Sequence, residues 1–166
     1  MLPICQQKVE VLSMAAGFFV LGRKGKNMYY LKSEAAFDSA HFLSGYDGKC
    51  KNLHGHRWKV VAEIKSEILS NEKQTRGMVI DFGDLKTALK GLCDNLDHSF
   101  IYEEGSLKSK TIEALKDEDF KLISVPFRPT AENFAKYFFD LLTNKGFEVN
   151  KVEVFETPNN SAAYGV

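Results

Sequence analysis

HGHRWKVVAEIK, residues 54–65, has the strict alternation of a β-strand that is buried on one face. Its even-numbered positions hold His54, His56, Trp58, Val60, Ala62 and Ile64. Its odd-numbered positions are mostly charged. Because successive side chains of a strand point to opposite faces of the sheet, the first set predicts the core face. The two histidines continue that face at the beginning of the strand.

A second strand is expected just upstream, within residues 28–43. Residues of one parity there are mostly apolar and end in a histidine: Tyr29, Leu31, Ala35, Phe37 and His41. This is the period of a half-buried strand, so His41 ends the strand on its inner side. The intervening SGYDGKCKN is rich in turn formers, and the two strands can be neighbours.

Two later segments change to a helical period. In residues 81–98, leucines recur three or four positions apart, which predicts a helix of about three turns ending near Asp97-His98, with Asp81 or Asp84 as its cap. In residues 128–146, apolar residues have the same spacing. Thr130 is the expected N-cap of this second helix and Gly146 its stop.

The remaining segments complete an α+β domain. Residues 103–119 are charged and weakly patterned, which is typical of a surface insertion, and a short strand is expected in FKLISV, residues 120–125. In the final strand, NKVEVFET, Glu156 shares the parity of the apolar valines. The order predicts one domain over residues 28–166, with two helices covering an antiparallel sheet.

The charge balance argues against a polynucleotide partner. Lysines and arginines number 22, as do aspartates and glutamates, so no net field attracts a polyanion. A small anionic substrate needs only a few cations and stays compatible with this balance. The three cysteines are odd in number and widely spaced, unlike a secreted disulfide framework, which favours the cytoplasm.

Residues 1–27 are expected to be an N-terminal extension. Their apolar stretch, VLSMAAGFFVLG, is shorter than the roughly 20 residues of a membrane-spanning helix, and its basic cluster follows it, unlike that of a signal peptide. The codons for GRKGKN can be purine-rich, as in a ribosome-binding site. The extension is therefore either translated from an upstream start, with Met28 the natural one, or a poorly ordered arm.

Three of the four histidines, His41, His54 and His56, are expected to point inward from neighbouring strands. Such a set can bind one Zn²⁺, and three histidine ligands leave the open position of a catalytic zinc. Gly55 leaves the backbone room to bend. One alternative is core histidines satisfied by backbone carbonyls. Another is a closed structural zinc site, because the spacing permits Cys50 as fourth ligand.

Other polar residues have two interpretations each. Cys50 is either a base or nucleophile, activated by a nearby cation, or a small buried residue. His98 follows Asp97 in a pair that can shuttle a proton, or is a histidine favoured by the helix dipole. Glu156 is costly to bury unpaired, so it meets either a cation or the N–H groups of a ligand. Cys93, on the buried side of a helix, is assigned no role.

Six motifs in order, from about Tyr29 to Tyr164, resemble the 6-pyruvoyl-tetrahydropterin synthase family: FDSAHFL, CKNLHGH, GMVIDFGDLK, LDH, PTAEN and ETPNNSAAY. The resemblance is closest to the bacterial branch that makes 6-carboxy-tetrahydropterin for queuosine, where the cysteine stands at the same short distance before HGH. It implies a tunnelling fold (T-fold), in which an antiparallel sheet and two helices join those of other subunits in a barrel. The expected homo-oligomer is a hexamer or tetramer with active sites at subunit interfaces.

The resemblance also implies residue roles. The zinc ligands would be His41, His54 and His56. The residues that move protons would be Cys50, His98 and Glu156, with Asp97 supporting His98. The residues that contact the pterin would be Glu156, Thr130 and Glu132.

The implied substrate is 7,8-dihydroneopterin triphosphate, and the implied products are 6-carboxy-tetrahydropterin, acetaldehyde and triphosphate. Lys49, Lys51 and Arg128 are candidate cations for the triphosphate. One alternative is a 6-pyruvoyl-tetrahydropterin synthase, which only eliminates and isomerises. Another is a noncatalytic zinc- or pterin-binding protein of the same fold, although binding alone would not need a thiol base.

Overall fold

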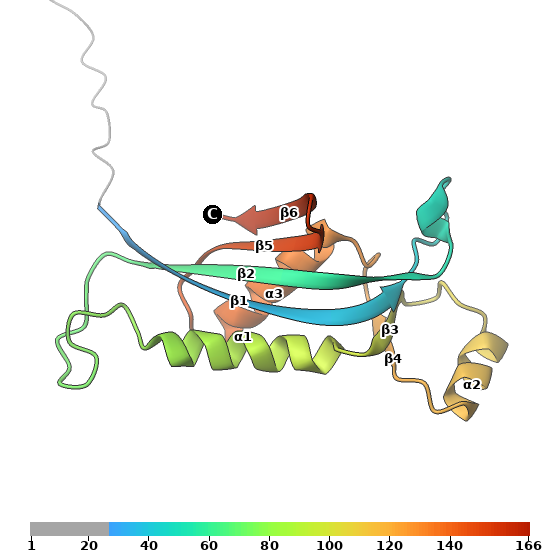
Figure 1. Ribbon diagram of the computed structural model, residues 1–166, viewed down its shortest axis with the longest axis horizontal. Coiled ribbons are helices and arrows are strands. Elements are labelled where there is room, and N and C mark those ends of the chain that lie inside the picture. The colour runs from blue at the N-terminus through green and yellow to red at the C-terminus, as the bar shows by residue number, and fades with distance from the viewer. Residues whose placement is uncertain (1–26) are drawn as a thin grey trace, which may run out of the picture.

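A computed structural model describes residues 27–166 as one curved, six-stranded sheet with helices (Figure 1). The strands are β1 (Tyr29–His41), β2 (His54–Ser66), β3 (Ser99–Glu103), β4 (Leu122–Val125), β5 (Val149–Thr157) and β6 (Asn160–Gly165). The helices are α1 (Phe82–Leu96), α2 (Ser109–Asp117) and α3 (Ala131–Asn144). The α+β prediction is confirmed. The predicted N-terminal extension, up to residue 26, lies outside the described residues.

The sheet has the strand order β4-β3-β1-β2-β5-β6. The pairs β1–β2, β2–β5 and β5–β6 are antiparallel, as expected. However, β3 is parallel to β1, and β4 is parallel to β3, which corrects the expectation of a wholly antiparallel sheet. The reason is that α1 and α2 provide the long crossovers that parallel neighbours need.

The two long strands have the register that their alternation predicts. They pair without interruption from Tyr29 opposite Ser66 to His41 opposite His54. Their shared inner face is closed to solvent, since Phe37 is 1% exposed and Trp58 is 0% exposed. The core therefore lies on the face that carries the histidines.

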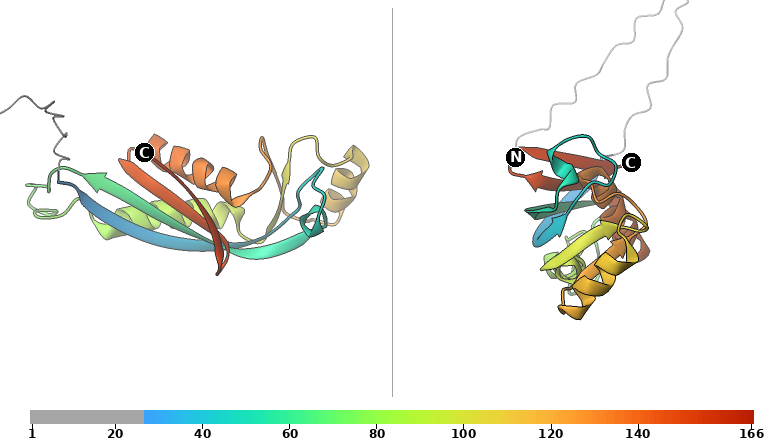
Figure 2. Two further views of the ribbon diagram at one scale, coloured as in Figure 1. Left: turned by 90° about the horizontal axis from the view of Figure 1, so that it is seen from above. Right: turned by 90° about the vertical axis from the view of Figure 1, so that its right-hand side faces the viewer.

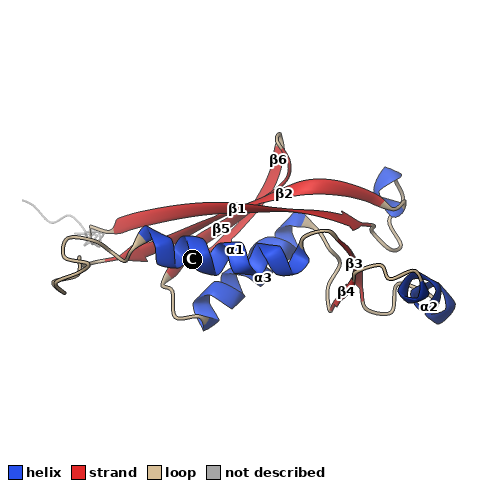
Figure 3. Cartoon of the chain, turned by 60° about the horizontal axis from the view of Figure 1, so that its bottom comes forward, coloured by secondary structure: helices blue, strands red, loops and turns tan. Residues whose placement is uncertain are grey.

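Helices α1 and α3 both cover this inner face, as Figures 2 and 3 show. Helix α1 begins after Asp81, whose side chain accepts a hydrogen bond from the backbone N–H of Gly83, and it is somewhat longer than predicted. Thr130 caps α3, and Gly146 follows that helix with a φ of 92°, which glycine adopts without strain. Within residues 27–166, every helix is too short or too polar to cross a membrane.

Three elements were not predicted. Strand β3 is only five residues long, and β6 contains mostly small, exposed residues, so neither shows a clear period. Helix α2 lies within the predicted insertion and buries none of its residues, in line with the surface position expected for residues 103–119. The short strand expected after the insertion is present as β4.

Candidate metal and catalytic site

The three predicted histidines form a cluster where β1 ends and β2 begins. His41 is the cross-strand partner of His54, and His56 follows two residues later on the same face. The ring centroids of His41 lie 4.5 Å from those of His54 and 5.2 Å from those of His56. A side chain at Gly55 would meet the backbone carbonyl of Ser39 at 3.3 Å, so glycine permits the close approach of the two strands here.

Backbone carbonyls orient two of these rings. The Nδ1 atom of His41 lies 2.8 Å from the carbonyl oxygen of Pro129, and Nδ1 of His54 lies 2.7 Å from that of Asn52. Because a carbonyl oxygen only accepts hydrogen bonds, each Nδ1 carries the proton and each Nε2 keeps its lone pair. Metal-binding histidines are oriented in this manner.

Burial keeps the cluster neutral. His41 is 1% exposed, and burial lowers its pKa to about 4, against the opposing effect of its hydrogen bond to Pro129. Burial also lowers the pKa of His56, while the carboxylate of Glu156 acts in the opposite direction. The Nε2 atoms of both histidines are buried without a hydrogen-bond partner in the described structure. Neutral imidazoles with unpartnered ring nitrogens fit a metal ion.

Glu156 is the fourth member of the cluster. One ligand atom each from His41, His54, His56 and Glu156 lie within 4.8 Å of one another. The closest of these contacts is 3.1 Å, between Nε2 of His56 and Oε1 of Glu156. Glu156 reaches the cluster because β5 stops pairing with β2 at Phe155. Three imidazoles and one carboxylate are a donor set typical of zinc and of neighbouring transition metals.

Neither cysteine belongs to this cluster. Cys50 lies in the 3₁₀ turn Lys49–Lys51 and is half-buried, but its sulfur is not among the converging ligand atoms of the described residues. The structure therefore gives no support to a closed site with Cys50 as fourth ligand. Cys93 is fully buried, and burial raises the pKa of its thiol to about 12, which agrees with assigning it no role.

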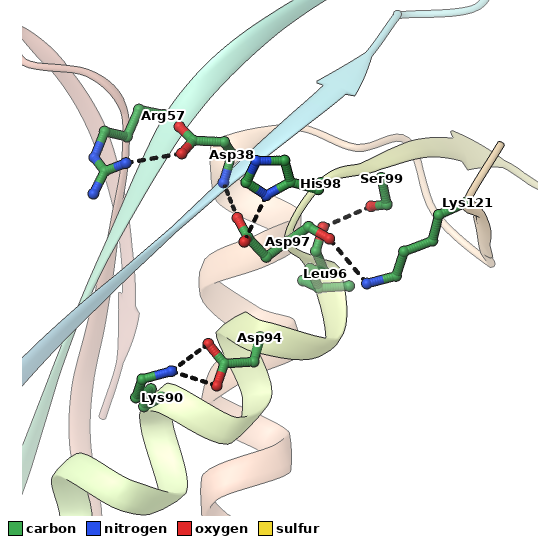
Figure 4. Close-up of polar contacts among 9 residues, drawn as sticks. All are labelled: Asp38, Arg57, Lys90, Asp94, Leu96, Asp97, His98, Ser99 and Lys121. Carbon is green, nitrogen blue, oxygen red and sulfur yellow. Dashed lines mark hydrogen bonds and ion pairs between the residues drawn. The ribbon is translucent and has the colours of Figure 1, made fainter.

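Asp97 and His98 form the predicted pair (Figure 4). The Nδ1 atom of His98 lies 2.7 Å from Oδ2 of Asp97, whose Oδ1 accepts a 2.7 Å bond from the backbone N–H of Asp38. These two contacts, that of Asp38 first, lower the pKa of Asp97. The backbone N–H of His98 in turn donates to the carbonyl of Asp38, and His98 has a φ of 50°. Asp38 thus holds the pair in place with both of its backbone groups.

Two cations adjoin this pair that the sequence did not indicate. Arg57 contacts Asp38 at 2.8 Å, across the β1–β2 pair. Lys121 donates a 2.9 Å hydrogen bond to the carbonyl oxygen of Asp97. Arg57 lies on the charged face of its strand and Lys121 follows the insertion, so neither carries a local signal of function.

His98 does not meet the histidine cluster within one chain. It lines a cavity of about 610 Å³ together with Asp38, Ala40, Arg57 and Phe100. Asp38 and Arg57 alternate with the core residues of their strands, so this cavity lies on the face of the sheet opposite α1 and α3. The sheet therefore separates the side chain of His98 from the cluster on the inner face.

A second cavity, of about 660 Å³, adjoins the cluster. Glu156 and His56 line it together with Glu34, Lys59 and Phe155. The two other predicted pterin contacts lie elsewhere. Thr130 is the half-buried cap of α3 and follows Pro129, which accepts the bond from His41, whereas Glu132 is exposed in the first turn of that helix.

Comparison with known proteins identifies one family. A profile described as 6-pyruvoyl tetrahydropterin synthase matches residues 30–165. The 6-carboxy-5,6,7,8-tetrahydropterin synthase of Haemophilus influenzae is 37% identical over 82% of this chain and 99% of its own. That of Rickettsia bellii is 38% identical over 74% of this chain and 90% of its own.

Solved structures of similar fold belong to the same group. The 6-pyruvoyl tetrahydropterin synthase of Caenorhabditis elegans superposes with a TM-score of 0.59 at 25% identity, covering 84% of this chain and 96% of its own. That of Plasmodium falciparum has a TM-score of 0.60 at 21% identity, covering 82% and 96%. The expected tunnelling fold is thereby confirmed for the subunit.

Proposed function

Because the chain belongs to the 6-pyruvoyl tetrahydropterin synthase family, we propose that it is a 6-carboxy-tetrahydropterin synthase. It would convert 7,8-dihydroneopterin triphosphate and water into 6-carboxy-5,6,7,8-tetrahydropterin, acetaldehyde and triphosphate, for queuosine biosynthesis in the cytoplasm. The names of its relatives in Haemophilus influenzae and Rickettsia bellii support this branch of the family.

The observation that carries the proposal is the oriented histidine cluster. His41, His54 and His56 would hold Zn²⁺ through neutral ring nitrogens, two of which are directed by the carbonyls of Pro129 and Asn52. A zinc ion in this position supplies Lewis-acid polarisation of the substrate's side-chain oxygens. A purely structural role would not require two buried ring nitrogens without partners.

Glu156 would bind the pterin ring. The guanidine-like edge of a pterin offers parallel N–H donors, which a carboxylate accepts in bidentate fashion. Glu156 lines the cavity beside the cluster, which has the volume of a small-molecule site. Thr130 and Glu132, at the beginning of α3, would complete the pocket from the side of His41.

Cys50 and His98 would move the protons. The Cys50 thiolate would accept a proton from the substrate side chain, and His98 would act as acid or base with its ring held by Asp97. Since one chain places His98 on the other face of the sheet from the cluster, this role requires a second subunit. That requirement supports a homo-oligomeric barrel, a hexamer or tetramer, with active sites at its interfaces.

The cations for the triphosphate are less well placed. Lys49 and Lys51 are exposed beside Cys50 and are available to a ligand. Arg128 instead donates a hydrogen bond to the carbonyl oxygen of Ser44, which fixes the loop after β1. We therefore retain the two lysines as candidates and assign Arg128 a structural role.

Product analysis tests the proposal. Zinc-loaded protein is incubated with 7,8-dihydroneopterin triphosphate, and acetaldehyde and pterins are followed by chromatography and mass spectrometry. The His54→Ala variant, which lacks one ligand, serves as background. Acetaldehyde in step with 6-carboxy-tetrahydropterin would support the assignment. A pyruvoyl pterin without acetaldehyde would replace it by the pyruvoyl synthase, and zinc binding without turnover would favour a binding protein.

A further inference from the structure

The contact between Glu156 and His56 is not a hydrogen bond. Oε1 of Glu156 lies 3.1 Å from Nε2 of His56, yet this buried nitrogen has no partner of hydrogen-bonding geometry in the described structure. Two donor atoms of one tetrahedral zinc, each at roughly 2.0–2.1 Å from the ion, lie roughly 3.3 Å apart. The carboxylate and the imidazole are thus arranged as two ligands of one cation.

No lysine or arginine in residues 27–166 neutralises Glu156. Its side chain is 28% exposed, and its only printed ion-pair partner is His56. The two cations that line the same cavity are engaged elsewhere, Arg57 with Asp38 and Lys59 over the ring of Phe155 at 4.1 Å. A half-buried carboxylate without a permanent cation is costly, and a metal ion at the cluster would remove this cost.

Glu156 also borders the cavity, and the backbone around it is loosely tied. The last β2–β5 pair joins Lys59 and Phe155, so Glu156 itself has no partner on β2. The pairing of β5 with β6 shifts register between Phe155 and Thr157. The side chain therefore has the metal cluster on one side and the ligand cavity on the other, with room to rotate between them.

We propose that Glu156 alternates between two partners. Without substrate it is the fourth ligand of the metal, and on substrate binding it leaves the metal to hold the ring edge of the pterin. This inference rests on the proposed function for the identity of the ring. Because metal and ring share one carboxylate, each weakens the binding of the other, and thermodynamic linkage makes the two effects equal.

The first half of the proposal is tested by zinc affinity, measured in competition with a chromophoric chelator. Glu156→Gln should bind zinc at least roughly 10-fold more weakly, since loss of even an outer partner of a ligand typically costs 10–100-fold. Glu34→Gln is the matched control, because Glu34 lines the same cavity but is outside the cluster. An affinity of Glu156→Gln equal to that of wild type would overturn the proposal.

The second half is tested with Co²⁺-loaded protein and unsubstituted pterin, which has the ring but no side chain for the metal. Binding of the ring, followed by its fluorescence, should change the visible absorption of Co²⁺ in wild type, because one ligand leaves. Glu156→Gln should show the altered spectrum before the ring is added. A ring that binds wild type without changing the spectrum contradicts the exchange. Neither measurement needs turnover, so the synthase assignment is judged separately, by its products.

Discussion

The Nδ1 atom of His41 donates a hydrogen bond to the carbonyl oxygen of Pro129, at 2.8 Å and across 88 residues of sequence. The bond joins the last residue of β1 to the segment that caps α3. It fixes which nitrogen of His41 carries the proton, and therefore which one can face a metal. The packing of α3 on the sheet and the chemistry of the cluster are coupled through this bond.

Replacing His54 by alanine is expected to remove the metal and leave the fold intact. His54 is a half-buried ligand at the end of the sheet, so its side chain contributes little to the core. The loss of zinc affinity should exceed the roughly 10–100-fold typical for an outer-shell partner. Metal analysis after dialysis and circular dichroism measure the two effects.

His98→Ala is the matched control for His54→Ala, because it also removes a histidine but from outside the cluster. It should keep its zinc and lose turnover. Full zinc occupancy in His54→Ala would contradict the ligand assignment.

Replacing Cys50 by alanine separates a base from a ligand. The sulfur of Cys50 is not among the converging ligand atoms, so Cys50→Ala should retain zinc. Turnover should fall by roughly 10²–10⁴-fold, the usual contribution of a general base. A large loss of metal in this variant would instead revive the closed structural site.

Replacing Asp97 by asparagine should slow turnover without changing metal content. Asp97 accepts from both His98 and the backbone of Asp38, and an amide cannot stabilise a protonated imidazole in the same way. We expect a roughly 10–100-fold loss of kcat, a part of the 10²–10⁴-fold that an acid–base group supplies. Asp94→Asn is the control, because Asp94 pairs only with the exposed Lys90 one turn earlier on the same helix. Equal kinetics in the two variants would remove Asp97 from the relay.

The long elements of the fold could be predicted because each repeats its period over many residues. Strands β1 and β2 alternate over 13 residues each, and the inner positions are those that pack on the helices. Strand β6 could not be predicted, since its small residues are held only by pairing with β5. A pattern of exposed small side chains has no periodic signal.

The histidine cluster was predictable for the same reason, since three histidines share the core parity of two neighbouring strands. The positions of Pro129 and His98 were not. Pro129 reaches His41 only through the packing of α3. His98 is placed on the far face of the sheet by the crossover through α1, and a local pattern cannot specify the result of such a crossover.

The metal-free protein is expected to lose stability as the pH falls from about 6.5 to about 4. Burial lowers the pKa of His41 from 6.5 to about 4, whereas the unfolded chain keeps the ordinary value. Between these values the unfolded state binds a proton that the folded state does not, so the free energy of unfolding decreases as the pH falls. Urea denaturation of chelator-treated protein across this window measures the slope. His41→Gln should have a shallower slope and the exposed His98→Gln an unchanged one, and equal slopes in all three proteins would contradict the assignment.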